Sequence, residues 1–216
     1  STVSVNQDAG FSIVSWNSNG GPVGSNYIGH GLDTTPEVII LKDREAAENW
    51  HFYSALVDGS WDYLYLDTDA AADNSGYPAA TSDYFYWSSG SGNDYVAYCW
   101  HSIEGYSKFG KYYGNASTDG PFVYTGFRPA LLIVKCTSST SGWAMIDAKR
   151  YPNNKYAADL PIYADTTAGE NGAHYTIGDF LSNGFKLRYH DSTFNGSQTF
   201  VYMAFAEMPF KYANAR

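Results

Sequence analysis

The apolar stretch PALLIVK, at residues 129–135, has a near twin in PEVIILK at residues 36–42. Each stretch opens on Pro, contains an unbroken aliphatic run (VIIL at 38–41 and ALLIV at 130–134) and ends on Lys. Proline is tolerated at the first residue of a strand, and a short, nearly continuous apolar run is typical of a strand buried on both faces. We therefore expect two equivalent central strands, one in each half of the chain.

The similarity extends, in the same order, to further blocks of sequence. GFS at residues 10–12 matches GYS at 105–107, and Trp50 follows the first apolar run as Trp143 follows the second. Each half closes on an aromatic-rich run, DYVAYCW at residues 94–100 and TFVYMAF at 199–205. The sequence therefore predicts an internal repeat, with halves at about residues 10–104 and 105–210.

Most of the chain consists of short strand-like runs between turns of Gly, Asn, Asp and Ser, a pattern typical of sandwiches and jelly rolls. The Asn183-Gly184 pair between apolar runs predicts a tight hairpin. Only residues 43–50 (DREAAENW) have helical composition, enough for a turn or two. The predicted fold is all-β, a β-sandwich or jelly roll of lectin-like type built from two similar halves.

The joint between the halves, at residues 102–104, is short and lacks linker composition. We therefore expect a single compact domain over residues 1–216. Two small β-sandwiches packed side by side, with the same boundary, are the alternative, because each half has about the length of an immunoglobulin-like domain.

The charge of the chain excludes some classes of partner. Its formal net charge is −9, from 13 Lys and Arg against 22 Asp and Glu, and no basic cluster interrupts this excess. Nucleic acids and anionic membranes are therefore unsuitable partners. No apolar run approaches the length of a membrane span, so we expect no membrane insertion. Cys99 and Cys136 lie in or beside apolar runs and are expected as buried free thiols, with one disulfide as the alternative.

Aromatic residues, 18% of the chain, give the clearest indication of a binding function. In a strand, Tyr84 and Tyr86 would share one face while Phe85 and Trp87 share the other. Sugars bind by stacking on aromatic rings while neighbouring polar groups bond their hydroxyls. The predicted ligand-binding residues are Trp61, Tyr63, Tyr84, Tyr86, Trp87 and Asp83. The alternative for each ring is ordinary sheet packing.

The acidic string at residues 66–74 (LDTDAAADN) is a candidate calcium loop. Calcium prefers several oxygen ligands at close range, and Asp67, Asp69 and Asp73 offer carboxylates. The EF-hand pattern is absent, so the alternative is a solvated loop. Beyond calcium, the sequence indicates no cofactor.

Catalytic patterns are weak. Glu104 and Glu207 follow the two closing runs at matching places in the repeat, and a pair of carboxylates is what a glycosidase needs. The alternative is that both are exposed strand ends. No zinc-like His spacing and no G-x-S-x-G motif occurs. We expect the chain not to be an enzyme.

Several strings identify a family resemblance. They are GHGL at residues 29–32 with Pro36, YVAYC at 95–99, GYSKFG at 105–110, GPFVYTGFRP at 120–129, and AFAE at 204–207 with Pro209 and Phe210. Together they resemble a two-repeat module of uncharacterised function in tail-fibre and other virion proteins of marine bacteriophages, including cyanophages. One departure is Trp100-His101, where relatives more often have Phe-Ala.

The resemblance implies a virion protein with a lectin-like β-sandwich, located on a tail fibre or capsid surface. We expect it to recognise a host cell-surface glycan, to contact other virion proteins and, by analogy with phage fibres, to form a homotrimer. A capsid-decoration or fibre-assembly protein is the first alternative, and a polysaccharide-degrading enzyme is the second. Any ligand site is expected in the loops that the halves do not share, at residues 67–87 and 151–175.

Overall fold

The computed structural model describes residues 1–18, 20, 22, 26–88, 92–150, 161–169 and 177–206. These residues form β-strands and no helix, and every strand pair is antiparallel. The all-β prediction is therefore confirmed, and two layers of sheet in each half are consistent with a β-sandwich. Within this part of the chain, no helix is long and apolar enough to cross a membrane.

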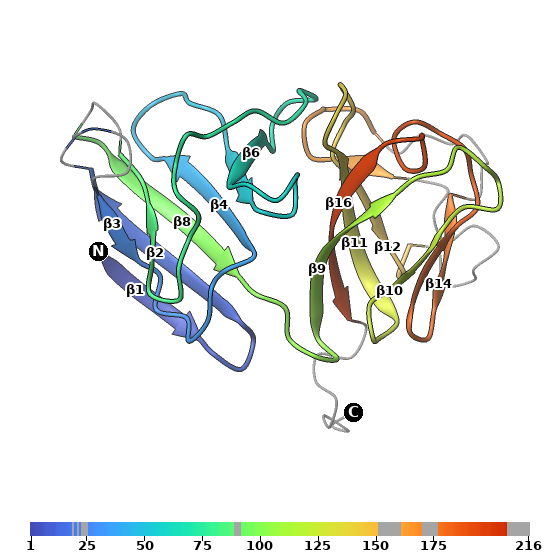
Figure 1. Cartoon of the computed structure of the whole chain (residues 1–216), viewed down its shortest axis with the longest axis horizontal. Helices are drawn as coiled ribbons and strands as arrows, with labels where there is room; N and C mark the ends of the chain where they lie inside the picture. Colours follow the sequence, from blue (N-terminus) through green and yellow to red (C-terminus); the bar gives the residue numbers. More distant parts are fainter. Residues whose placement is uncertain are drawn as a thin grey trace. The chain divides into compact units, whose positions relative to one another are not determined.

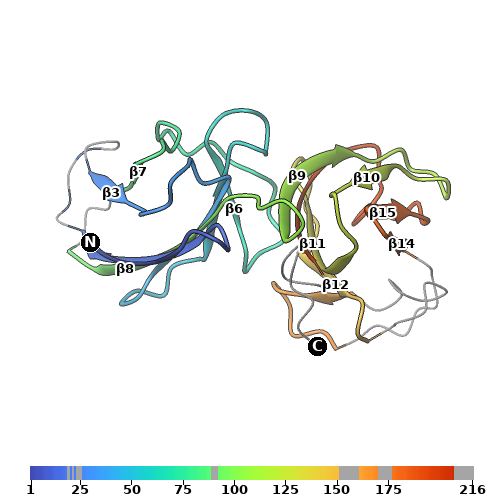
Figure 2. The ribbon, with the colours of Figure 1, turned by 90° about the horizontal axis from the view of Figure 1, so that it is seen from below.

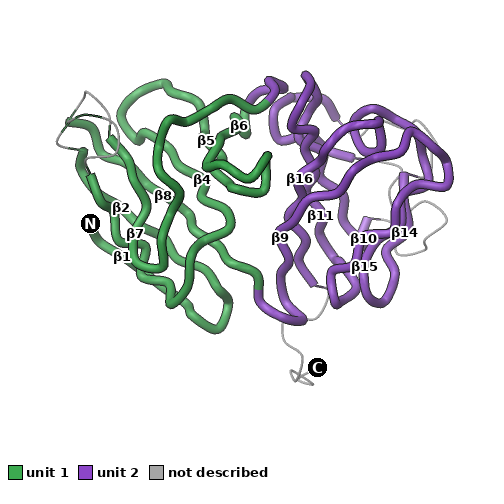
Figure 3. Tube along the Cα trace, in the orientation of Figure 1, with its two compact units in different colours: residues 1–67, 72–102 green, residues 68–71, 103–216 purple. Residues whose placement is uncertain are grey.

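The chain divides into two compact units (Figure 3). The first unit contains residues 1–67 and 72–102, and the second contains residues 68–71 and 103–216. The division between Ser102 and Ile103 lies close to the repeat boundary expected from the sequence.

The first unit has a large sheet and a two-stranded ribbon (Figures 1 and 2). The large sheet has the order β1 (Thr2–Asn6), β2 (Phe11–Asn17), β8 (Asp94–Trp100), β4 (Val38–Asp43), β5 (His51–Ser54) and β6 (Asp62–Tyr65). The ribbon pairs β3 (Tyr27–Gly29) with β7 (Tyr84–Tyr86). Side chains from both, including Val14, Leu41 and Phe85, build one hydrophobic core.

The second unit repeats this plan with a five-stranded sheet and a three-stranded sheet. The larger sheet has the order β13 (Ile162–Tyr163), β12 (Ala144–Asp147), β11 (Pro129–Cys136), β16 (Thr199–Ala206) and β9 (Ser107–Tyr113). The smaller sheet has the order β10 (Phe122–Tyr124), β15 (Gly184–Leu187) and β14 (Gly178–Leu181). Leu132, Phe185 and Phe200 are among the residues of the core.

The two units share their strand order. Five strands of the first large sheet lie in the spatial order β2-β8-β4-β5-β6. The large sheet of the second unit has the order β9-β16-β11-β12-β13, in which each strand takes the place of the strand with the same rank along the chain. The strands that the sequence comparison equates, β4 with β11 and β8 with β16, occupy equivalent central places. A shared, non-sequential strand order is what duplication of one segment produces.

Details of the strand assignment mostly follow the sequence. The hairpin β14–β15 turns at Ser182-Asn183, with Leu181 paired to Gly184. β4 and β11 are central, although burial along β4 mainly alternates, so one of its faces is only half-buried. The helical interpretation of residues 43–50 was wrong. The chain forms an irregular loop there, because Lys42 Nζ donates to the carbonyl oxygens of Ala46 and Glu48 and Trp50 N donates to Asp67 Oδ1, so these backbone groups are not paired within a helix.

Both cysteines are free and buried, as expected. Cys99 lies in the first unit and Cys136 in the second.

Candidate functional site

The aromatic residues predicted to bind ligand all lie in the first unit, but they differ in exposure. Trp61 and Trp87 are buried, with 6% and 8% of their surface exposed. Tyr63, Tyr84 and Tyr86 are half-buried, and Asp83 is exposed. The predicted alternation along β7 is confirmed, because Phe85 and Trp87 are buried while Tyr84 and Tyr86 are not.

Tyr84 and Tyr86 form one group with Tyr27, which pairs with Tyr86 across the β3–β7 ribbon. The three ring centroids are 5.0 to 5.4 Å apart, and 62% of Tyr27 is exposed. The sequence analysis missed Tyr27 because a three-residue strand is too short to show a clear alternation.

A second group surrounds His51, at the start of β5. Its ring centroid lies 5.5 Å from that of Tyr63 and 5.6 Å from that of Trp87. Trp61 stacks behind this group on Tyr53, at 6.4 Å. The predicted residues therefore divide between the outer face of the ribbon and the surroundings of His51.

A pocket of about 390 Å³ opens beside the second group. It is lined by Leu41, Asp43, Ala46, Glu48, His51, Trp87, Ser88, Asn93 and Tyr95. β4, β5 and β8 supply its base, and the residues after β7 and before β8 supply its wall. It combines aromatic rings with a few polar groups, which is the usual composition of a small-molecule site.

Asp43 is the fixed charge of the pocket. Its carboxylate is 4% exposed and accepts hydrogen bonds from Asn93 Nδ2 at 2.8 Å, Glu45 N at 2.8 Å and Ala46 N at 2.9 Å. Burial would raise the pKa of Asp43, but these bonds and one from Tyr95 outweigh it and lower that pKa to about 2. Asp43 is therefore an ionised acceptor at any physiological pH.

Two polar atoms of the pocket residues lack a hydrogen-bond partner within the described part of the chain. They are Nε1 of Trp87 and Nδ1 of His51, and both are buried. Burial is the largest effect on the pKa of His51 and lowers it, while the nearby carboxylates of Glu48 and Asp67 oppose this, so its imidazole is neutral at pH 7. A buried polar group without a partner costs about 1–3 kcal/mol, so such groups point to a ligand or to water.

The second unit provides an internal comparison for the pocket. Asp43 on β4 pairs with Tyr95 on β8, and Cys136 on β11 pairs with Phe200 on β16. Because β4 corresponds to β11 and β8 to β16, Asp43 is equivalent to Cys136 and Tyr95 to Phe200. Strand register also equates His51, which faces Leu41, with Ala144, which faces Val134.

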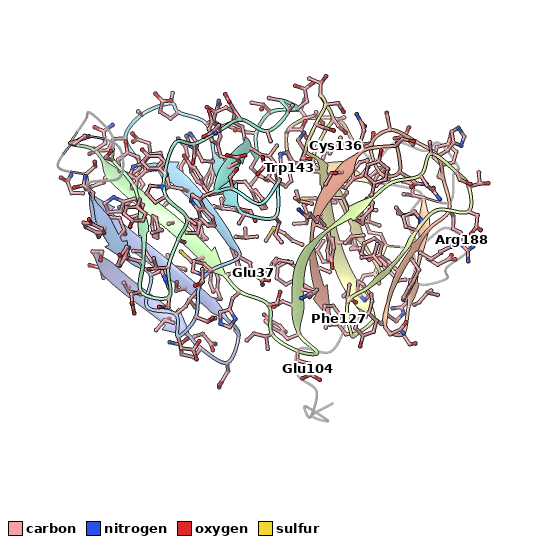
Figure 4. All side chains as sticks on the ribbon, viewed as in Figure 1. Glu37, Glu104, Phe127, Cys136, Trp143 and Arg188 are labelled. Atoms are coloured by element: carbon pink, nitrogen blue, oxygen red, sulfur yellow. The ribbon has the colours of Figure 1, made fainter. Side chains whose placement is uncertain are left out.

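Cys136, Phe200 and Ala144 are all 0% exposed and belong to the hydrophobic core of the second unit; Cys136 is labelled in Figure 4. At these three positions the first unit has pocket-lining residues, and the second unit has buried core residues.

Comparison with known proteins identifies the family. The model of the family described as Domain of unknown function (DUF7483) matches residues 1–209. The chain belongs to this family. No curated protein and no solved structure matches it.

The acidic residues predicted for calcium do not gather in this DUF7483 chain. Asp67 Oδ1 accepts the N–H of Trp50, and Asp73 Oδ1 accepts that of Asn74. Asp69 belongs with residues 68–71 to the second unit, where its carbonyl accepts Ser141 N and Lys135 Nζ. Among the described residues, no group of three or more His, Cys, Asp or Glu could hold a metal ion.

Other expected positions are separate from the pocket. Glu104 is exposed at the start of the second unit, and Glu207 lies outside the described residues (Figure 4). Of the loops proposed for ligand, residues 67–87 contribute Trp87, while residues 151–160 and 170–176 lie outside the described part of the chain.

Sequence reasoning missed Asp43, His51, Asn93 and Tyr95. The signal lay in the repeat, where Lys42-Asp43 aligns with Lys135-Cys136 and Tyr95 with Phe200. Comparison of the two halves therefore picks out positions that are polar in the first half and apolar in the second.

Proposed function

We propose that this chain is a non-catalytic carbohydrate-recognition domain of a phage virion surface or tail fibre. In this proposal, the pocket of the first unit binds a sugar ring of a host cell-surface glycan. The observation that carries the proposal is that Trp87, whose buried Nε1 has no hydrogen-bond partner among the described residues, lines the same pocket as the ionised carboxylate of Asp43.

A sugar hydroxyl meets the needs of both groups. It accepts the indole N–H with its oxygen and donates its proton to a carboxylate, and the apolar face of a pyranose packs against an aromatic ring. Trp87, Tyr95 and His51 supply rings, and Asn93 supplies a further amide. A volume of about 390 Å³ lies within the range of small-ligand sites.

The virion context comes from the family resemblance of the sequence. Under this proposal, the chain contacts other virion proteins and presents the pocket to the host surface, as part of a homotrimer or another assembly. The lectin-like form of the sandwich belongs to the same proposal.

The test is a glycan array and a host-cell adsorption assay with the full chain, comparing wild type with Trp87→Phe and His51→Ala. Trp87→Phe keeps an aromatic ring and removes the N–H, and His51→Ala copies the second unit. We expect each to weaken binding at least tenfold. Tyr124→Phe, at a ring that is 66% exposed in the second unit, is the control and should bind as wild type does.

Absence of binding to every glycan and to host cells would refute the recognition function. Release of reducing ends from a bound polysaccharide would refute its non-catalytic character and favour the degrading enzyme.

A structural role in capsid decoration or fibre assembly is the second candidate, because both units carry exposed rings on their smaller sheets. Tyr27 is 62% exposed on β3, and Phe122 and Tyr124 are 45% and 66% exposed on β10. Light scattering on Tyr27→Ser and Tyr124→Ser variants tests this role, which predicts that the oligomer dissociates while glycan binding persists.

A further inference from the structure

The charge of the pocket lining is one-sided. Two of its nine residues are carboxylates, Asp43 and Glu48, and none is Lys or Arg. Glu48 is exposed at the rim, whereas Asp43 is buried. His51 is the remaining titratable group with a basic nitrogen.

Asp43 cannot turn away from a ligand. One of its carboxylate oxygens accepts two backbone N–H groups and the other accepts Asn93 Nδ2, and with the bond from Tyr95 four donors hold the group in place. A ligand in the pocket therefore meets a fixed negative charge whose orientation does not depend on the ligand.

The nearby cation, Lys42, does not offset this charge within the pocket. Lys42 lies between Leu41 and Asp43 on β4, so its side chain leaves the opposite face of the strand. Its ammonium donates to the carbonyl oxygens of Ala46 at 3.0 Å and Glu48 at 2.7 Å. Both hydrogen bonds fix the ammonium on the loop backbone, and Lys42 is not a lining residue.

We propose that the pocket selects a pyranose unit without negative charge, a neutral hexose or a hexosamine, and rejects uronates, sulfated sugars and sialic acids. This inference rests on the carbohydrate-binding function proposed above. A ligand carboxylate or sulfate would lose its hydration and face Asp43 at short range without a cation. An ammonium group, in contrast, would gain a charge-assisted hydrogen bond.

The experiment measures binding of matched methyl glycosides to the full chain by ligand-observed NMR and competition. The panel contains the hexose, the hexosamine and the hexuronate in both gluco and galacto configuration. We expect the hexosamine to bind as tightly as the hexose or more tightly, and the uronate at least tenfold more weakly, about 1.4 kcal/mol.

Glu48→Gln is the matched variant, because Glu48 is an exposed lining residue whose exchange leaves the fold intact. Glu48→Gln should reduce the difference in affinity between the hexose and the uronate. Lys42→Met should leave that difference in affinity unchanged.

The outcomes separate the two proposals. If no member of the panel and no array glycan binds, the recognition function fails and the charge selection fails with it. If the uronate binds as tightly as the hexose and binding still requires Trp87, the recognition function stands and the charge selection is overturned. Loss of uronate binding in Lys42→Met while hexose binding is retained would show that Lys42 reaches the ligand, which also overturns the charge selection; the retained hexose binding shows that the loop at Ala46 and Glu48 is still in place.

Discussion

Replacing Asp43 tests the central claim that a fixed carboxylate organises the pocket. In Asp43→Ala, the donors at Asn93 Nδ2, Glu45 N and Ala46 N and the Tyr95 side chain lose their acceptor. In Asp43→Asn, the side-chain oxygen still accepts both backbone N–H groups, but its amide now faces that of Asn93. The two variants therefore remove different numbers of hydrogen bonds from the same turn.

The magnitude follows from these bonds. A hydrogen bond to a charged group contributes about 1.5–3 kcal/mol net, and the two backbone donors lie in a loop that water can reach. We expect Asp43→Ala to destabilise the first unit by about 3 kcal/mol and Asp43→Asn by about 1.5 kcal/mol. Because the folded pKa is depressed, the stabilisation is present above pH 3.8 and is lost as the pH falls towards about 2.

The assay is urea unfolding followed by tryptophan fluorescence. Five of the six tryptophans, Trp16, Trp50, Trp61, Trp87 and Trp100, lie in the first unit, so the signal reports mainly on that unit. Trp143 reports on the second unit and should show an unchanged transition. Equal losses for the Ala and Asn variants, or a loss below about 0.5 kcal/mol for Ala, would refute the argument that the carboxylate holds the turn.

Three further predictions concern packing, protonation and thiols. Gly184→Ala should destabilise the second unit by more than about 2 kcal/mol in urea unfolding followed by far-UV circular dichroism, because a Cβ there would clash with Val123 O. Gly29→Ala, whose Cβ would have its nearest atom at 3.7 Å, should cost the first unit less than about 1 kcal/mol. Burial lowers the pKa of His30 and His51, so below the unfolded pKa of about 6.5 the unfolded chain binds more protons than the folded chain. Thermal melts between pH 7 and pH 5 should therefore show the first unit losing stability as the pH falls, by up to about 1.4 kcal/mol per pH unit for each histidine. His30→Gln should reduce this pH dependence. Ellman's reagent should react with neither Cys99 nor Cys136 in the folded chain and with both thiols in urea, because both are buried and burial raises the pKa of Cys99 to about 12. Rapid reaction of either thiol in the folded chain would contradict this burial.

The strands could be predicted from the sequence because their signals are local. PEVIILK and PALLIVK are recognisable alone, and their likeness reveals that the halves match. The pocket could be predicted only in part. Trp87 stands in an obvious aromatic run, whereas Asp43, His51 and Asn93 are scattered along the chain and meet only through the register of β4, β5 and β8. No sequence pattern encodes that register directly.

The helix expected at residues 43–50 failed for a related reason. Its composition favours a helix, and Asp43 accepts the N–H groups of Glu45 and Ala46 as a helix N-cap would. The carbonyl oxygens of Ala46 and Glu48, however, accept Lys42 Nζ, and Trp50 N donates to Asp67 Oδ1, so contacts that the local sequence does not encode hold the segment in a loop.

The unpartnered indole of Trp87 gives the sharpest link between stability and function. If its N–H awaits a ligand, the free protein bears a desolvation cost of about 1–3 kcal/mol that Trp87→Phe relieves. The smaller ring loses about 1–2 kcal/mol of burial, so the first unit should change by less than about 1 kcal/mol.

Trp61→Phe is the matched control. Trp61 is 6% exposed in the same unit, and its indole nitrogen is not among the buried atoms without a partner. Trp61→Phe loses buried apolar area and removes no unpartnered N–H group, so urea unfolding should show a clear loss of stability. A Trp87→Phe variant that is as destabilised as Trp61→Phe would mean that the Trp87 N–H is already satisfied, by water or otherwise, and that glycan binding needs another explanation. Near-native stability with lost glycan binding is the combination that a binding residue, and not a core residue, produces.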